Sequence, residues 1–278
     1  MVKKKTLGSK ILDAAILILT ALTHWVVFYF IIITACKSKT ESARFSLALP
    51  KEWALLENLK FVFTYNHSAV FQAFYNSLIL TACSIFVLVI VAAMAAFVLQ
   101  RRRNRICQAS NKLILAGLIV PASVIPTYWM LSILGIANTL PGLILVEVAT
   151  LFPFATMMYK GFIATLPREI DEAALLDGCG SLRLFFRIIF PLLKPITAAV
   201  VILRSIVVYN DFQNPQYFMS GAKSQTVQLF TYSLKSAFTT DYGHLFAAIL
   251  VVAFPMIVLY AVLNRSILEG MVAGSVKG

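Results

Sequence analysis

The fold is decided by residues 71–99, FQAFYNSLILTACSIFVLVIVAAMAAFVL, which hold no charged residue and are followed by Arg101, Arg102 and Arg103. A helix needs about 20 apolar residues to cross roughly 30 Å of hydrocarbon, because each residue adds about 1.5 Å of rise. Residues 71–99 exceed that length. We therefore expect them to form a membrane-spanning helix.

The rest of the chain has the same character. Of its 278 residues 60% are hydrophobic and only 13% are charged, and its mean hydropathy is +0.84. A soluble domain carries about a quarter charged residues. The composition excludes a soluble globular protein and predicts an all-α integral membrane protein whose first partner is the lipid bilayer.

Six apolar runs are long enough to cross the membrane, and together they predict one transmembrane domain over residues 1–278: 11–35, 71–99, 112–134, 142–160, 196–219 and 244–264. The first run ends in Ile33-Thr34-Ala35-Cys36, which resembles the processing box of a lipoprotein signal peptide. A signal peptide has an apolar core of only about 7–15 residues, however, so an uncleaved anchor helix is favoured.

The distribution of cations predicts the orientation. The formal net charge is +12, and most of the 24 Lys and Arg residues fall in the termini and in alternate loops, on the side that holds the N-terminus. The positive-inside rule then places both termini in the cytoplasm. The cations form short clusters between apolar runs, without an aromatic-interleaved basic face, so nucleic-acid binding is not expected.

The loop of residues 161–195 is too polar to cross the membrane. Pro167 suits the first turn of a helix, and three acids follow where the positive end of the helix dipole favours them: Glu169, Asp171 and Glu172. Asp177-Gly178-Cys179-Gly180 provides the glycines that end such a helix. The pattern predicts a short helix followed by a sharp turn.

A second, amphipathic helix is predicted after this turn. Ser181 is placed to cap its start. Its apolar residues recur at i, i+3, i+4 and i+7: Leu182, Phe185, Phe186 and Ile189. Pro191 and Pro195 then redirect the chain. We expect the two helices to form a hairpin against the cytoplasmic membrane face, where it is either a surface loop or a docking element for a soluble partner.

A family resemblance is carried by six residues of this loop: Glu172, Ala173, Ala174, Gly178, Ile188 and Pro191. Their spacing resembles the EAA loop of binding-protein-dependent ABC importer permeases, with Phe190 in place of the usual Leu. Other segments resemble the shorter six-span subunit of maltose-type carbohydrate permeases: Asn76-Ser77, Ala95-Ala96-Phe97, Ile125-Pro126-Thr127-Tyr128, the turn from Gly135 to Gly142, and Asn210-Asp211-Phe212, with Tyr209 in place of the usual Trp.

The resemblance implies a coupling helix between the fourth and fifth spans that docks on an ATP-hydrolysing subunit. The residues implied in this coupling are the six above together with Asp177. The implied partners are a second permease subunit, two ATPase subunits and an extracellular solute-binding protein, in the plasma membrane of a prokaryote. ATP and Mg²⁺ would bind to the ATPase subunits, and this chain would bind no cofactor.

The sequence lacks the motifs of nucleotide-binding proteins, hydrolases and metalloproteins. No G-x-x-x-x-G-K-[ST], G-x-S-x-G or H-E-x-x-H string occurs, and the four cysteines have no C-x-x-C spacing, so neither a nucleotide site nor a metal site is expected. The chain is therefore interpreted as a transport subunit and not an enzyme. The alternatives are an importer permease for a solute other than a sugar, a channel, or an integral-membrane enzyme.

Ionisable and polar groups inside the spans are candidates for the translocation path. A charged side chain in the bilayer costs at least about 2.5–3.5 kcal/mol, so Glu147 and Arg204 should face the bundle interior. They either line a polar cavity for sugar hydroxyls or pair with each other or with the companion permease. Further candidates to bind or stack on a sugar are Tyr128, Trp129, Tyr209, Asn210 and Asp211, although aromatic residues at this depth also serve as interfacial anchors.

Overall fold

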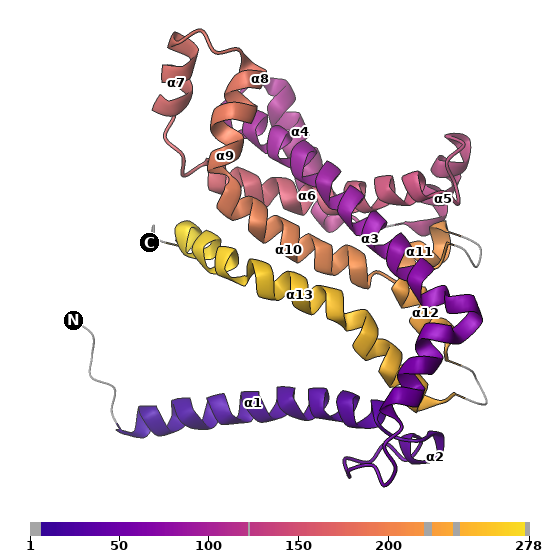
Figure 1. The fold of residues 1–278 in the computed structure, drawn as a ribbon. Coiled ribbons are helices and arrows are strands. Elements are labelled where there is room, and N and C mark those ends of the chain that lie inside the picture. The colour runs from indigo at the N-terminus through magenta and orange to yellow at the C-terminus, as the bar shows by residue number, and fades with distance from the viewer. Residues whose placement is uncertain (1–6, 122, 220–223, 236–239, 276–278) are drawn as a thin grey trace. The chain divides into compact units, whose positions relative to one another are not determined.

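The computed structural model describes residues 7–121, 123–219, 224–235 and 240–275, with the side chains of 7–11 and 263–275 left out. Both chain termini lie outside this range. All the regular secondary structure in the described part is helical (Figure 1). The chain divides into two compact units, residues 1–71 with 230–254, and residues 72–229 with 255–278.

The first unit contains α1 (Leu7–Ala35), α2 (Lys39–Ser42), the start of α3 (Leu55–Arg101) and the start of α13 (Tyr242–Ser275). Asn58 is buried, and its Nδ2 donates to the carbonyls of Ala35 and Lys37 at 2.8 and 3.0 Å. The ring of Phe61 stacks on that of His244 at 3.7 Å. These contacts join the end of α1 to α3 and α13 within this unit.

Helix α3 contains a break before its apolar part. Tyr65 is extended, and the next three residues, Asn66, His67 and Ser68, adopt the left-handed backbone region with φ of 46°, 55° and 62°. This region disfavours residues with a Cβ atom, so the break separates two helical segments. The predicted span of residues 71–99 lies in the segment after the break.

The second unit contains the later parts of α3 and α13 together with α4 (Arg105–Ile119), α5 (Val124–Ile133), α6 (Leu140–Ile163), α7 (Glu169–Leu176), α8 (Ser181–Leu184), the π-helix η1 (Phe185–Ile189), α9 (Phe190–Leu192), α10 (Lys194–Asn210) and α11 (Gln213–Phe218). Helix α12 (Val227–Ser233) begins in the second unit and ends in the first. Local caps start several of these helices. Asn104 Oδ1 accepts the Cys107 amide at 2.8 Å at the start of α4, and Thr139 Oγ1 accepts the Gly142 amide at 3.2 Å at the start of α6.

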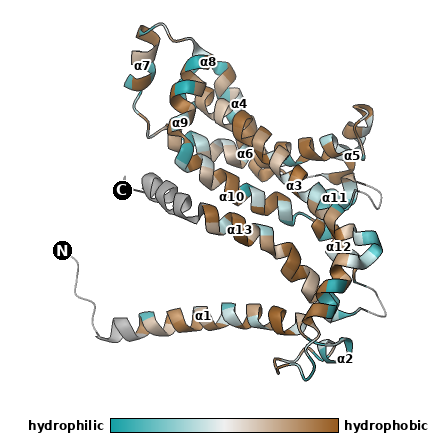
Figure 2. Cartoon of the chain, in the orientation of Figure 1, coloured by the Kyte–Doolittle hydropathy of each residue, from teal (hydrophilic) through white to brown (hydrophobic). Residues whose placement is uncertain are grey.

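The core of the second unit lies where α3, α6 and α10 meet. Small residues on α3, Ala92, Ala93 and Ala96, are fully buried there and permit close approach of the helix axes. Tyr159 of α6 is also fully buried, and its hydroxyl donates to Thr197 Oγ1 at 3.1 Å. These helices are rich in apolar residues along their length (Figure 2), and several of them are exposed, such as Phe86, Phe154 and Leu203, as expected for helices that face lipid.

Four helices in the described part are long and apolar enough to cross a membrane: α1, α3, α6 and α13. A fifth crossing follows if Ser181–Leu192 and Lys194–Asn210, which meet at 76°, count as one broken span. The protein is therefore membrane-embedded and multi-pass. The count of six stays a prediction.

Two of the six predicted runs are not single helices. Residues 112–134 form α4 and α5, with the backbone extended at Val120 because Pro121 disfavours the helical region for the residue before it. Residues 196–219 form α10 and α11. Helix α10 ends at Asn210 because Asp211 turns out of the helix and its side chain accepts the Gln213 amide at 2.8 Å.

Candidate functional site

The first candidate site is the turn after α7. The Cys179 amide donates to the Ala174 carbonyl at 2.9 Å, and the Gly178 amide donates to the Leu175 carbonyl at 3.0 Å. This pair of bonds is a Schellman motif, which requires a left-handed residue after the helix. Gly178 fills that position with φ of +74°, and open space surrounds it. Glycine is thus needed here for its backbone conformation and not for close packing.

The two faces of α7 differ in exposure. Glu172 and Ala173 are exposed, and Leu176 is 89% exposed. Ala174 is buried against the core of its own unit. Of the two adjacent alanines, only Ala173 therefore presents a small side chain to the outside, beside a carboxylate and a large apolar group.

The second arm of the turn differs from its prediction in two ways. Gly180, not Ser181, is the N-cap of α8, and no side chain caps this helix. Phe185 and Ile189 of the predicted apolar stripe are buried, but Leu182 is 67% exposed and Phe186 is also exposed. The reason is η1: a π-turn has a longer period than an α-helix, so the stripe does not stay on one face.

Sequence reasoning missed a contact between α3 and α7. The Arg101 Nε lies 2.6 Å from Asp171 Oδ2, and the guanidinium also donates to the Leu166 carbonyl at 3.2 and 3.3 Å. In the sequence, Arg101 belongs to a run of three arginines, and no feature of the sequence distinguishes it from the other two. For Asp171 the only predicted role was a favourable interaction with the positive end of the α7 dipole.

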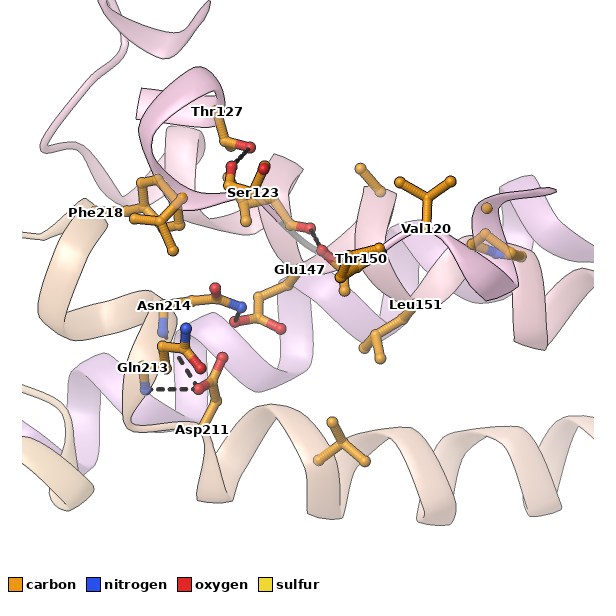
Figure 3. A pocket seen from close by; sticks show the side chains of 17 residues that line it. Val120, Ser123, Thr127, Glu147, Thr150, Leu151, Asp211, Gln213, Asn214 and Phe218 are labelled. Carbon is orange, nitrogen blue, oxygen red and sulfur yellow. Dashed lines mark hydrogen bonds between the residues drawn. The ribbon is translucent and has the colours of Figure 1, made fainter. Parts of the chain in front are cut away.

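The second candidate site is a cavity of about 580 Å³, which Figure 3 shows from close by. A cavity of this size lies in the range of small-molecule sites. Its lining comes from α4, α5, α6, α10 and α11, and the polar lining residues are Ser123, Thr127, Glu147, Thr150, Asp211, Gln213 and Asn214. Carboxylates, amides and hydroxyls are all partners for sugar hydroxyls.

Glu147 is the most buried polar group of this cavity, at 2% exposure. Asn214 Nδ2 donates to Glu147 Oε1 at 3.1 Å. Asp211 Oδ1 accepts from the backbone amides of Gln213 and Asn214 at 2.8 and 3.3 Å (Figure 3). Asn214 therefore bridges the two acids. No Lys, Arg or His side chain lines the described wall of the cavity, so its polar surface is anionic.

The remaining path candidates lie away from this wall. Among the described residues no ion pair joins Glu147 to Arg204, as one alternative required, and the Arg204 guanidinium lies 3.9 Å from the centre of the Phe154 ring. Tyr209 is buried in α10. Their role in transport stays a prediction.

Two further candidates make hydrogen bonds elsewhere. Asn210 Oδ1 accepts from Gln228 Nε2 at 3.1 Å, and the Tyr128 hydroxyl accepts from Asn138 Nδ2 at 3.1 Å. Neither residue lines the cavity. The polar lining residues that sequence reasoning did not name for the path are Ser123, Thr127, Thr150, Gln213 and Asn214.

A family described as "Binding-protein-dependent transport system inner membrane component" matches residues 62–268, which include both candidate sites. The chain belongs to this family. Proteins of similar sequence are named as sugar permeases. The melibiose/raffinose/stachyose import permease protein MelC of Bacillus subtilis is 32% identical, and the alignment covers 94% of each chain. The diacetylchitobiose uptake system permease protein NgcG of Streptomyces coelicolor is also 32% identical, over 95% of this chain and 86% of that protein.

A solved structure has the same fold as this family member. It is a chain of a bacterial ABC transporter involved in the import of the acidic polysaccharide alginate, with a TM-score of 0.82, 95% of this chain and 99% of that chain covered, and 18% sequence identity. At this identity the likeness concerns the fold alone. Family and fold thus agree with the resemblance seen in the EAA loop.

Proposed function

We propose that this chain is the permease subunit of an ATP-driven importer and forms half of the translocation path for a neutral sugar or oligosaccharide. The observation that carries the proposal is the family match, because residues 62–268 hold both the α7 turn and the cavity. The named relatives support the sugar class: they are permeases for melibiose, raffinose, stachyose and diacetylchitobiose.

The α7 turn is the docking element of this proposal. Its exposed Glu172 and Ala173 offer one charge beside a small side chain, and Leu176 adds an apolar contact. A groove in an ATPase subunit would bury these groups, and Glu172 would pair there with a cation. Two ATPase subunits, each holding ATP and Mg²⁺, would close on two such turns, one from this chain and one from a second permease.

The cavity is this chain's share of the path. It offers hydroxyl, amide and carboxyl groups to a sugar delivered by an extracellular solute-binding protein. Its two acidic residues, with no cation among the described lining residues, disfavour an acidic sugar, because like charges repel by about 1–4 kcal/mol at 4 Å for effective dielectric constants between water and a protein surface. Glu147 and Asp211 are thus assigned to selectivity, with Arg204, Tyr209, Asn210 and Tyr128 as supporting residues.

The proposed topology has six crossings with both termini in the cytoplasm of a prokaryotic cell. Helices α1, α3, α6 and α13 each cross once, α4 with α5 crosses as an interrupted pair, and the bent pair that ends in α10 crosses once. The turn after α7 is then cytoplasmic, and the α1–α3 connection is external. The positive-inside distribution of Lys and Arg supports this orientation.

Single-cysteine labelling tests the topology. The four native cysteines are replaced by serine, and one cysteine is introduced by Ser181→Cys or by Ala43→Cys, since both positions are exposed. We expect an impermeant maleimide added to intact cells to label the Ala43→Cys variant, and to label the Ser181→Cys variant only after the membrane is opened. Labelling of both from the same side would contradict the topology, and failure of any ATPase to co-purify would contradict the importer assignment.

A further inference from the structure

The C-terminal end of α3 holds the segment that leads into α7. Arg101 is the last residue of α3, and its guanidinium contacts three successive parts of that segment: the Leu166 carbonyl at 3.2 Å, the Pro167 carbonyl at 3.4 Å and Asp171 Oδ2 at 2.6 Å. The Arg101 and Asp171 side chains are each only 12% exposed. The contact with Asp171 is an ion pair and not a hydrogen bond, since Arg101 Nε has no hydrogen-bond partner among the described residues. An ion pair that is shielded from water is little screened by salt.

The same end of α3 also touches the second arm of the hairpin. The Phe97 ring, one helical turn before Arg101, lies 5.6 Å from the Phe185 ring, and Phe185 in turn packs on Phe190 at 5.8 Å. Phe185 is buried, and it opens η1. Thus α3 has one polar contact to α7 and one aromatic contact to the arm after the turn, although it is not covalently next to either.

If only the covalent connections of the chain passed on a movement of α7, that movement would reach α6 and α10. We propose that Arg101 is a positioning residue that ties α7 to α3, so that a movement of α7 is passed to α3 as well. The proposal rests on the coupling role proposed for α7. Only arginine has the planar fork that can meet a carboxylate and two carbonyls from one helix end.

The chain offers a matched control. Arg103 lies two residues after Arg101, carries the same charge and is exposed. Arg101→Gln and Arg103→Gln therefore remove the same charge from the same side of the membrane. If Arg101 served only the positive-inside distribution, the two variants would behave alike.

The test compares Arg101→Gln, Asp171→Asn and Arg103→Gln in the complete transporter, reconstituted with its ATPase and solute-binding protein. We expect all three to co-purify with the ATPase. Substrate-stimulated ATP hydrolysis, relative to basal hydrolysis, should fall about tenfold in the first two, because the loss of an ion pair that is largely shielded from water changes a local equilibrium by roughly that factor. It should be unchanged in Arg103→Gln.

A double variant separates positioning from a general loss of structure. We expect Arg101→Gln combined with Asp171→Asn to lose about as much stimulated hydrolysis as Arg101→Gln alone, because both changes remove the same contact between α3 and α7. Equal stimulation in Arg101→Gln and Arg103→Gln would overturn the proposal, as would an additive loss in the double variant. Either result would leave the docking role of Glu172 untouched, because that role is read by ATPase co-purification and not by the Arg101 pair.

Discussion

The turn after α7 and the cavity beside Glu147 both use carboxylates, but in opposite surroundings. Glu172 is exposed on a helix whose other exposed residues are Glu169, an alanine and two leucines. Glu147 is almost completely buried and is held by Asn214. An exposed charge without a fixed partner is suited to recognition of another protein, whereas a buried and bridged charge is suited to shaping a polar interior.

Charge reversal at the turn should give the largest effect. In Glu172→Lys the docking helix would present a like charge to the cation that we propose in the ATPase groove. Loss of a buried interfacial charge pair costs about 2–5 kcal/mol, so we expect ATPase co-purification to fall by at least about 30-fold. The measurement is the ratio of ATPase to permease recovered from detergent-solubilised membranes.

Glu169→Lys is the control for this reversal. Glu169 lies on the same helix and is also exposed, but it lies one turn further from Gly178. We expect a several-fold weaker loss of the ATPase than in Glu172→Lys. Equal recovery of the ATPase in Glu172→Lys and in the unmodified transporter would remove the docking role of this helix.

The backbone of the turn gives the next prediction, because two of its glycines differ in conformation. Gly178 has φ of +74°, whereas Gly180 has φ of −68°, and a Cβ at either position would meet open space. A β-branched residue in the left-handed region costs about 1–3 kcal/mol. Gly178→Val should therefore lower substrate-stimulated ATP hydrolysis about tenfold, and Gly180→Val should leave it nearly unchanged.

This pair of variants isolates backbone conformation from side-chain volume. Both add the same side chain to the same turn, and insertion into the membrane should be equal in both. If Gly180→Val were as damaging as Gly178→Val, the volume of the added side chain would explain the loss, and the left-handed conformation would not.

The turn was predictable from sequence because its causes are local. The acids before Glu172 and the glycine at 178 lie within one or two turns of the structure they determine, and α7 begins and ends where they indicate. The second arm was not predictable in this way, because the spacing of apolar residues does not reveal a π-helix such as η1. The contact of Arg101 with Asp171 joins residues 70 positions apart, a separation that no local pattern encodes.

The cavity was predictable only in part for a related reason. Glu147 was found because a charge is expensive in a span, so it indicates a polar interior by itself. Asp211 was named only as a polar group that could hydrogen-bond a sugar. Asn214 and Gln213 are uncharged, so their presence in a predicted span does not indicate a polar interior. They lie in the cavity wall because the helix breaks after Asn210, before the end of the predicted span. Of the alternatives for Glu147 and Arg204, the described residues show no ion pair between the two side chains, and Arg204 lies on Phe154.

The smallest effect is expected inside the cavity. Glu147→Gln keeps the size of the side chain and keeps an oxygen that can accept from Asn214 Nδ2, but it removes one of the two acidic groups of the lining. We expect ATPase co-purification to stay normal and uptake of a neutral oligosaccharide to change less than about threefold, since one hydrogen bond is worth about 1 kcal/mol or less when its geometry is kept. Discrimination against an oligosaccharide that bears a uronic acid should weaken about three- to tenfold, because one like-charge repulsion is lost.

Glu57→Gln is the matched control, since it makes the same chemical change on an exposed residue near the start of α3. Its ratio of neutral to acidic uptake should equal that of the unmodified transporter. The measurement is competition between a labelled neutral oligosaccharide and an unlabelled acidic one, with saturating binding protein for each. An unchanged ratio in Glu147→Gln would mean that this carboxylate serves the packing of α6 against α11 and does not face the cargo, and the contrast between an exposed recognition charge and a buried selective one would then hold only for the turn.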